Sequence, residues 1–283
     1  MTTPTIDIVP LDAPLGAEVR GLDLTADPDG DDVFALLDAF RRHHVLVVRS
    51  QPIDDERLRA VASWFGSPYI PPADIPMFGD EDQGLVSVLS NRDDAGVGSR
   101  IPLPHHTDLQ YMPIPLLGAA LHSVRVPPEG GDTLWSNLHQ AYDELDDATK
   151  QRLEGLRGIA LNPFAGQGLG REFTGDGQHF VEHEVPDFPH PLVRTHPDTG
   201  RKALYMSSFI IGIDGIDDPD DEQQLIGLLN AHVDQDHLYY RHQWQEGDTI
   251  IWDNRCTNHK REDFDQSYPR EMHRVQIAGT RPF

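Results

Sequence analysis

The sequence predicts a mainly β fold of the α+β class, a β-barrel or jelly roll with flanking helices. Short apolar runs rich in β-branched residues recur along the chain, and the amphipathic helical segments are few and lie mostly early. Glycine and proline number 24 and 23, which favours a turn-rich chain over a helical bundle. Nothing in the 283 residues marks a linker, so we expect one domain spanning residues 1–283.

Two amphipathic helices and three short strands are expected near the N-terminus. The strands cover residues 6–9, 18–20 and 45–48. One face of the first helix is apolar and consists of Val33, Phe34, Leu36, Leu37 and Phe40. Asp31 or Asp32 is suited to cap its start, because a short acidic side chain accepts from free backbone N–H groups. The second helix is expected at 54–65, with Gly66 as its end.

Strand-like segments dominate the rest of the chain. They cover residues 118–126, 133–135, 202–206, 249–252 and 274–278. Helices are expected at 139–156 and at 220–233. Residues 67–84 and 91–104 are expected to be loops. Because long loops in compact domains are often lids, 67–84 is a candidate lid, and a passive proline-rich connector is an equal alternative.

Charge and composition exclude several classes of partner. The net charge is −24, from 23 basic and 47 acidic side chains, and a field of that sign repels nucleic acid and anionic lipid. Cys256 is the only cysteine, which rules out an internal disulfide and fits a reducing compartment. We see neither a signal peptide nor a membrane span. We therefore expect a cytoplasmic protein with a small-molecule partner; homo-oligomerisation is left open.

One short motif carries metal chemistry. In an extended strand, residues i and i+2 point to the same face, so His106 and Asp108 can aim at one point while His105 and Thr107 face away. A distant histidine, His259, follows the apolar run at 250–252 and can supply a third ligand. Two histidines and one carboxylate leave three octahedral positions open, as a non-haem Fe(II) oxygenase requires. A zinc hydrolase that uses the same three ligands is the alternative.

Charged residues near these histidines are candidates for supporting roles. Asp253 and Arg255 are candidates for supporting the metal ligands or for forming an ion pair, and an ordinary turn network is the favoured interpretation. On a strand, Arg270 and Arg274 share one face with Met272 and Gln276 and stand roughly 13 Å apart at the backbone. Two guanidinium groups so placed can bind two different anions around one metal, and a surface ion pair is the alternative for either.

These motifs together resemble the taurine dioxygenase and 2,4-dichlorophenoxyacetate dioxygenase (TauD/TfdA) family. The similarity runs nearly from end to end and has its blocks in the family's order. The matching blocks are residues 15–24, 106–108, 130–135, 193–197, 252–255 with His259, 272–274 and 281–283. So many ordered matches are far more specific than any one of them, and they favour functional roles for residues that would otherwise be assigned to a turn or a surface ion pair.

The resemblance implies a fold and a set of roles. The family fold is a double-stranded β-helix, a cupin-like jelly roll. His106, Asp108 and His259 match the Fe(II) ligands. Thr133 matches the threonine that hydrogen-bonds the cosubstrate 2-oxoglutarate, and Arg270 the arginine that pairs with its distal carboxylate. Arg274 matches the arginine that receives the substrate's own anionic group.

The reaction that the resemblance implies is oxidation of a small anionic molecule by O₂. Hydroxylation of a C–H bond, with release of succinate and CO₂, is the leading expectation. Desaturation, cyclisation and C–O or C–S cleavage stay open, because these outcomes share the same initial hydrogen abstraction.

The substrate pocket departs from that of taurine dioxygenase. That enzyme's pocket histidine and tyrosine fall on Pro71 and Asp74 here, an expected asparagine is Pro102, and an expected tryptophan is His105. We therefore expect a substrate other than taurine. The weaker candidates for lining the pocket are Tyr69, Asp74, Ser207 and Phe209, and core packing explains Phe209 equally well.

Overall fold

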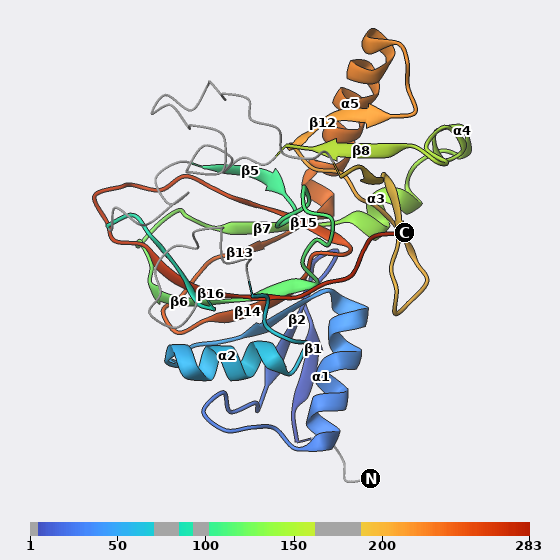
Figure 1. Ribbon diagram of the computed structural model, residues 1–283. Coiled ribbons are helices and arrows are strands. Elements are labelled where there is room, and N and C mark those ends of the chain that lie inside the picture. The colour runs from blue at the N-terminus through green and yellow to red at the C-terminus, as the bar shows by residue number, and fades with distance from the viewer. Residues whose placement is uncertain (1–4, 71–84, 93–101, 162–187) are drawn as a thin grey trace.

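Two β-sheets stacked face to face form the centre of the molecule in the computed structural model, which describes residues 5–70, 85–92, 102–161 and 188–283 (Figure 1). The larger sheet has seven strands in the order β1-β2-β3-β14-β6-β16-β4. Their bounds are β1 Asp7–Pro10, β2 Ala17–Arg20, β3 Val45–Val48, β14 Thr249–Asp253, β6 Gly118–Arg125, β16 Glu271–Ile277 and β4 Ser87–Ser90. Only the β2–β3 pair is parallel.

The smaller sheet has four antiparallel strands in the order β13-β7-β15-β5. Their bounds are β13 Tyr239–His242, β7 Thr133–Asn137, β15 Thr257–Arg261 and β5 Leu103–His106. Its inner face packs on the larger sheet through tryptophans: the rings of Trp135 and Trp252 lie 5.8 Å apart and both are fully buried. Met272 belongs to the same buried apolar cluster, so apolar side chains fill the space between the sheets at this end.

Two helices cover the outer face of the larger sheet, as Figure 1 shows in blue. These are α1 Gly30–His43 and α2 Asp55–Ser63. Leu36 and Phe40 of α1 are buried in one cluster with Val275 and Ile277 of β16. Burying a side chain of this size contributes about 1.5–3 kcal/mol. Alternate residues of β16 therefore face opposite clusters, which confirms the predicted alternation along this strand.

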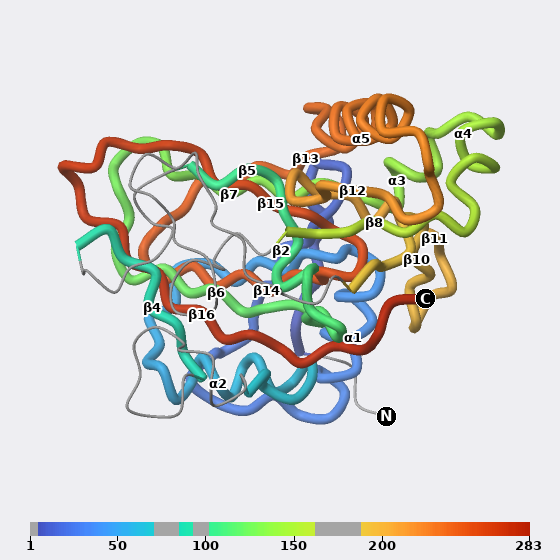
Figure 2. The backbone as a smooth tube through the Cα atoms, turned by 45° about the horizontal axis from the view of Figure 1, so that its top comes forward, coloured from blue at the N-terminus to red at the C-terminus, as the bar shows by residue number. Residues whose placement is uncertain are grey.

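A third layer of helices and short strands packs against the smaller sheet (Figure 2). Its helices are α3 Leu138–Asp143, α4 Asp147–Arg152, α5 Pro219–Val233 and the 3₁₀ turn η1 Asp236–Leu238. Its strands are β8 Arg157–Ala160, β9 His190–Pro191, β10 Val193–Thr195, β11 Lys202–Leu204 and β12 Ile210–Asp214. A strand-rich core with few helices, as predicted from the sequence, is confirmed.

The first helix begins earlier than expected. Asp29, rather than Asp31 or Asp32, is the N-cap, and its carboxylate accepts from the backbone N–H of Asp32. The Asp32 carboxylate instead accepts from the N–H and hydroxyl of Thr5 and so ties down the N-terminal segment. Phe34 was wrongly assigned to the apolar face: it is 74% exposed, because helical spacing places it away from the buried pair Leu36 and Phe40.

Other boundaries also differ from the predictions. The helix expected at 139–156 is two helices, because Asp146 accepts from the N–H of Thr149 and starts a new one. Helix α2 ends at Ser63, three residues before Gly66. Strand β5 begins at Leu103, inside the segment expected to be a loop. Several short strands were missed altogether; they are β4, β8, β9, β10, β12, β13 and β15.

No helix in the described ranges is long and apolar enough to cross a membrane.

Candidate active site

Two histidines far apart in sequence are cross-strand neighbours. Strands β5 and β15 pair antiparallel, and His106 lies directly opposite His259. Opposed residues in a pair of strands point to the same face, so the two imidazoles meet, with ring centroids 4.2 Å apart. The ring of Trp252 lies 5.0 Å from that of His259, which places the pair between the two sheets. Sheet register therefore brings together two histidines that 152 intervening residues separate in the sequence.

Asp108 completes a group of three. It lies in the turn just beyond β5, beside Leu109, whose φ is +53°. Its Oδ1 is 3.7 Å from Nε2 of His106. One ligand atom from each of His106, Asp108 and His259 lies within 4.8 Å of the other two. The structure thus brings together the three residues predicted as metal ligands.

The hydrogen bonds in this group leave metal-ligand atoms free. Nδ1 of His106 donates to the carbonyl of Pro104 at 2.8 Å, so its Nε2 keeps a lone pair on the side of Asp108. Oδ2 of Asp108 and Nδ1 of His259 are buried and have no hydrogen-bond partner among the described residues. An unsatisfied buried polar atom costs about 1–3 kcal/mol. A bound cation would offset that cost, so the donor set fits a metal ion.

The protonation states also suit a metal. Burial, with the neighbouring charge of His106, lowers the pKa of His259 to about 3, and burial lowers the pKa of His106 as well. Both imidazoles are therefore neutral at physiological pH, the form that coordinates metals. Burial alone would raise the pKa of Asp108, but the charge of Arg274, followed by the histidines, outweighs it and keeps that pKa low. The group carries one negative charge.

Arg274 lies beside this group, and Arg270 lies elsewhere in the inter-sheet space. Nη1 of Arg274 donates to Oδ1 of Asp108 at 3.2 Å. Arg270 is only 3% exposed, and its Nη2 donates to the carbonyl of Gly131 at 3.3 Å. Nε of each arginine is buried without a hydrogen-bond partner among the described residues. The two guanidinium groups therefore occupy separate places, as their spacing on one strand predicted.

Arg270 is a buried cation, and among the described residues none of its side-chain hydrogen bonds goes to a carboxylate. Burial, and then the charge of Arg261, lowers its pKa to about 9, while Asp132 acts in the opposite direction. An aromatic ring lies beside this guanidinium: Cζ of Arg270 is 5.9 Å from the centroid of the Phe264 ring. Gly131 has φ +69°, and a Cβ there would lie 3.1 Å from Nε of Arg270. Glycine at this position thus leaves the guanidinium room.

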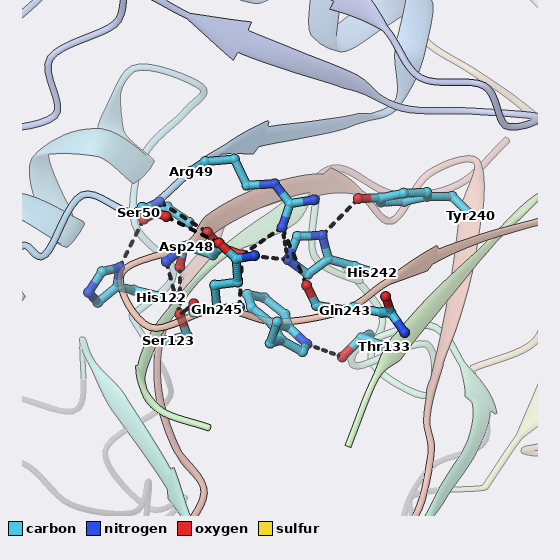
Figure 3. Close-up of polar contacts among 12 residues, drawn as sticks. Arg49, Ser50, His122, Ser123, Thr133, Tyr240, His242, Gln243, Gln245 and Asp248 are labelled. Atoms are coloured by element: carbon cyan, nitrogen blue, oxygen red, sulfur yellow. Dashed lines mark hydrogen bonds and ion pairs between the residues drawn. The ribbon is translucent and has the colours of Figure 1, made fainter. Parts of the chain in front are cut away.

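Thr133 is the first residue of β7, two residues after Gly131, which contacts Arg270. It is a cross-strand neighbour of both Arg261 and His242. Its Oγ1 accepts a 3.0 Å hydrogen bond from the indole N–H of Trp244, which leaves the hydroxyl proton available for an anion (Figure 3). The Trp244 ring packs on His242 with centroids 4.5 Å apart.

A polar network around His242 and Asp248 holds Trp244, the hydrogen-bond partner of Thr133, in place (Figure 3). His242 Nε2 and Asp248 Oδ2 are 3.0 Å apart, and His242 Nδ1 is 2.7 Å from the hydroxyl of Tyr240. Arg49 donates to Asp248 at 2.8 Å. The network links Arg49, directly after β3, to β13 and to the turn before β14, and thereby orients Trp244 toward Thr133.

The weaker pocket candidates differ in their surroundings. The Phe209 ring lies 5.7 Å from that of His106, and Ser207 is buried with its hydroxyl donating to Gln110 Oε1 at 2.6 Å. The backbone N–H of half-buried Tyr69 donates to the carbonyl of Gln276 at 2.8 Å. Asp74, like Pro71, lies outside the described residues, as does most of the candidate lid at 67–84.

Sequence reasoning missed Tyr111, which lies near the group of three. Burial, followed by the charges of Tyr69 and Asp108, raises the pKa of its phenol. Its position three residues after Asp108 was the available signal. His105, by contrast, was correctly expected to face away: its Nε2 is 3.2 Å from Asn230 Oδ1.

Asp253 and Arg255 form a buried ion pair, one of the roles considered for them from the sequence. Nη2 of Arg255 donates to Oδ2 of Asp253 at 2.7 Å, and Nη1 donates to Asp198 at 2.9 Å. Nε2 of His196 is 3.0 Å from the same Asp253 oxygen. Since these contacts leave no free ligand atom toward His259, the turn-network interpretation holds.

Comparison with known proteins gives consistent results. The model of the taurine catabolism dioxygenase TauD, TfdA family matches residues 7–276. An (S)-phenoxypropionate/alpha-ketoglutarate-dioxygenase of Sphingobium herbicidovorans is 32% identical, over 98% of this chain and 96% of its own. An alpha-ketoglutarate-dependent sulfate ester dioxygenase of Pseudomonas putida is also 32% identical, over 98% and 91%.

A solved structure supports the same relationship. A taurine dioxygenase from Burkholderia xenovorans superposes with a TM-score of 0.82 and 31% identity, covering 99% of this chain and 91% of its own. None of these relatives supports the metal-hydrolase alternative. The match over almost the whole length, at these identities, shows that the chain is a dioxygenase and belongs to the TauD/TfdA family.

Proposed function

We propose that this protein is an Fe(II)- and 2-oxoglutarate-dependent oxygenase that hydroxylates a C–H bond of a small anionic molecule, with release of succinate and CO₂. The observation that carries the proposal is the meeting of His106, Asp108 and His259 within 4.8 Å, buried and with ligand atoms unsatisfied. Two neutral imidazoles and one carboxylate suit non-haem Fe(II) and leave positions for cosubstrate and O₂. Iron and 2-oxoglutarate supply O₂ activation, which no side chain can provide.

The chain's own residues bind and orient the cosubstrate. Arg270 and the hydroxyl of Thr133 hold the distal carboxylate of 2-oxoglutarate, and a guanidinium without a described carboxylate partner is suited to that anion. Trp135 and Trp252 close the far side of His259 and exclude water. The two facing sheets that support these residues are proposed to form a double-stranded β-helix within one domain, residues 1–283.

Arg274 is proposed to receive the substrate's anionic group. It lies against Asp108, and a guanidinium there can pair with a carboxylate, sulfonate or sulfate ester next to the metal. The names of the two relatives, a phenoxypropionate dioxygenase and a sulfate ester dioxygenase, support an anionic substrate. Tyr69, Asp74, Ser207 and Phe209 remain proposed pocket residues.

The proposed substrate is not taurine, because the pocket histidine, tyrosine and asparagine expected from taurine dioxygenase are Pro71, Asp74 and Pro102 here. The further departure, His105, faces away from the metal group and is not part of this argument. Taurine still belongs in the screen, since one similar structure is of a taurine dioxygenase. Desaturation, cyclisation and C–O or C–S cleavage are alternative outcomes of the same site. A cytoplasmic location and homo-oligomerisation stay predictions.

Succinate formation tests the proposal. Protein freed of metal is supplied anaerobically with Fe(II) and 2-oxoglutarate, O₂ is admitted, and succinate is measured with and without anionic candidate substrates. The wild type is expected to form succinate, and His106→Ala to form none above the rate without protein. The matched control is His105→Gln, which alters the neighbouring histidine on the opposite face and is expected to keep the activity. Equal rates in wild type and His106→Ala would overturn the proposal.

A further inference from the structure

A second group of buried potential metal ligands lies outside the proposed active site. It consists of His44, His139 and Cys256, whose ligand atoms all lie within 4.8 Å of one another. His44 is the left-handed C-cap of α1, His139 is on α3, and Cys256 is in the turn between β14 and β15. All three are almost completely buried.

Backbone hydrogen bonds fix the three segments against one another. The N–H of Asp253 donates to the carbonyl of His44 at 2.9 Å, and the N–H of Leu138 donates to the carbonyl of Cys256 at 3.0 Å. The imidazole rings of His44 and His139 lie 5.1 Å apart. The convergence of the three side chains is therefore built into the main chain.

The hydrogen bonds show which of these atoms lack partners. Nδ1 of His139 is 2.7 Å from the carbonyl of Lys202, but its Nε2 is buried and has no partner among the described residues, and the same is true of Nδ1 of His44. Within the described part of the chain, the one hydrogen bond of the Cys256 thiol is a long contact, 3.9 Å, to the carbonyl of Asp253. This group thus contains buried nitrogen atoms without a hydrogen-bond partner among the described residues, as does the group of His106, Asp108 and His259.

An overlapping group gives a useful contrast. His196, Asp253 and Cys256 also lie within 4.8 Å. There, however, Nε2 of His196 is bonded to Asp253, its Nδ1 accepts from the N–H of Asp198, and the Asp253 oxygens are occupied by Arg255. That group is a satisfied structural network and needs no ion.

We propose that His44, His139 and Cys256 form a second, structural metal site for a thiophilic divalent cation, Zn²⁺. Thiolate and imidazole are the ligands that zinc prefers. Binding converts the Cys256 S–H to a metal-bound thiolate and releases one proton to solvent. The ion joins the end of α1 to α3 and to the turn that precedes His259, and so stabilises the frame of the active site without taking part in the reaction.

The dimensions are compatible with such an ion. Three atoms no more than 4.8 Å apart can all lie within 4.8 Å divided by the square root of three, about 2.8 Å, of one point. Zinc bonds to nitrogen and sulfur measure about 2.0–2.3 Å. Side-chain shifts of about 0.5 Å for the sulfur and about 0.8 Å for the nitrogens therefore suffice. Burial lowers the pKa of His44 to about 3 and that of His139 to about 4, so both imidazoles are already neutral.

Cobalt substitution tests the site, because Co²⁺ takes zinc positions and a cobalt–thiolate bond absorbs strongly in the near ultraviolet. Cys256 is the only cysteine in the chain, so this absorption can arise only there, whatever metal the His106 site binds. Because the site is buried, protein is produced in cobalt-supplemented medium so that metal enters during folding. Metal content is measured in parallel by mass spectrometry, on this protein and on protein from zinc-supplemented medium.

The wild type and His106→Ala are both expected to show the thiolate absorption and to retain zinc at this site. Cys256→Ser is expected to lose the absorption, and His44→Gln and His139→Gln to lower zinc occupancy at least about ten-fold, the usual effect of weakening a ligand shell. Circular dichroism and the melting temperature establish that each variant is folded. If Cys256→Ser does not fold, the two histidine variants carry the test. Absence of thiolate absorption in folded wild type, or its full retention in the folded double variant His44→Gln/His139→Gln, would overturn the proposal.

Discussion

At the scale of single residues, the proposed active site works through charges held where water is absent. Asp108 shows the balance: burial opposes its ionisation, and Arg274 with the two histidines more than compensates. One guanidinium thus keeps the carboxylate anionic and, in our proposal, also receives the substrate. When the substrate's anion arrives, Arg274 has to divide its donors between two partners.

Replacement of Arg274 by Gln is expected to weaken substrate binding more than metal binding. Loss of a charge-assisted hydrogen bond costs about 1.5–3 kcal/mol, which corresponds to about a 10- to 150-fold increase in KM for an anionic substrate. Arg274→Lys, which keeps the charge but not the planar fork, should lie between. Steady-state kinetics measure KM, and the Fe(II) affinity is titrated separately. An unchanged KM in Arg274→Gln would contradict the proposed role.

Arg270 is expected to lower the stability of the folded protein and to strengthen the binding of 2-oxoglutarate. Its guanidinium is buried and burial lowers its pKa to about 9, which means that the positive charge lowers the free energy of unfolding. Arg270→Met should therefore keep or raise the melting temperature of the protein without cosubstrate, and should weaken 2-oxoglutarate binding at least about ten-fold. Calorimetry with Mn(II), which supports binding without turnover, measures the affinity. A variant that binds 2-oxoglutarate normally would disprove the assignment.

Which residues could be foreseen depends on how local their signal is. His106 and Asp108 are two positions apart, so strand geometry alone predicted that they converge. The position of His259 depends on the register of β15 against β5, which no local pattern specifies. Its place after the apolar run at 250–252 made it a candidate third ligand, and the family resemblance then favoured that role. Tyr111 and the support of Thr133 by Trp244 were missed, because they depend on side-chain packing.

At the scale of secondary structure, capping and short strands explain most of the differences. Residues 27–32 contain four aspartates, and periodicity does not specify which of them caps α1. The strands that were missed have few apolar residues or are only two to five residues long, too short for alternation to be recognised. Strand β3 at Val45–Val48 is equally short, but all four of its residues are apolar, and its bounds were predicted correctly.

The N-cap role of Asp29 in α1 can be tested by substitution. Asp29→Ala removes the acceptor for the N–H of Asp32 and is expected to lower the free energy of unfolding by about 1 kcal/mol. Asp29→Ser, which keeps an oxygen acceptor, should restore most of that loss. Chemical denaturation monitored by circular dichroism measures both. Equal stabilities of the Ala and Ser variants would show that the cap is unimportant.

At the scale of the whole molecule, buried neutral histidines couple folding to pH. Burial lowers the pKa of His44 and His259 to about 3 and that of His139 to about 4, against 6.5 for exposed histidine. Below pH 6.5 the unfolded chain therefore binds more protons than the folded chain, and stability falls as pH decreases toward the folded pKa values. The depressed pKa of Asp253 adds to the loss in stronger acid.

We accordingly expect the free energy of unfolding of metal-free protein to change little above pH 7 and to fall between pH 6.5 and pH 4. Each buried histidine contributes at most about 1.4 kcal/mol per pH unit. His139→Gln, which cannot titrate, should show a shallower decline than the wild type. Urea denaturation at a series of pH values measures this, and identical slopes for the two proteins would contradict the expectation.

The net charge of −24 also acts on the whole molecule. It repels an anionic substrate at long range, so binding must depend on local pairing at Arg274; screening within about 8 Å at physiological salt makes this feasible. Composition alone predicted that nucleic acid and anionic lipid are unsuitable partners, but it could not identify the substrate, whose pocket is formed partly by residues far apart in the sequence.

The central claim is that His106, Asp108 and His259 bind one iron while Arg270 holds 2-oxoglutarate beside it. The most direct measurement is an anaerobic crystal structure with Fe(II) and 2-oxoglutarate, with anomalous scattering recorded at the iron edge. The account predicts one strong iron peak at coordination distance from all three side chains, about 2.0–2.2 Å, and the distal carboxylate of 2-oxoglutarate against Arg270 and Thr133. An iron peak away from His259, or a cosubstrate carboxylate that does not contact Arg270, would contradict it.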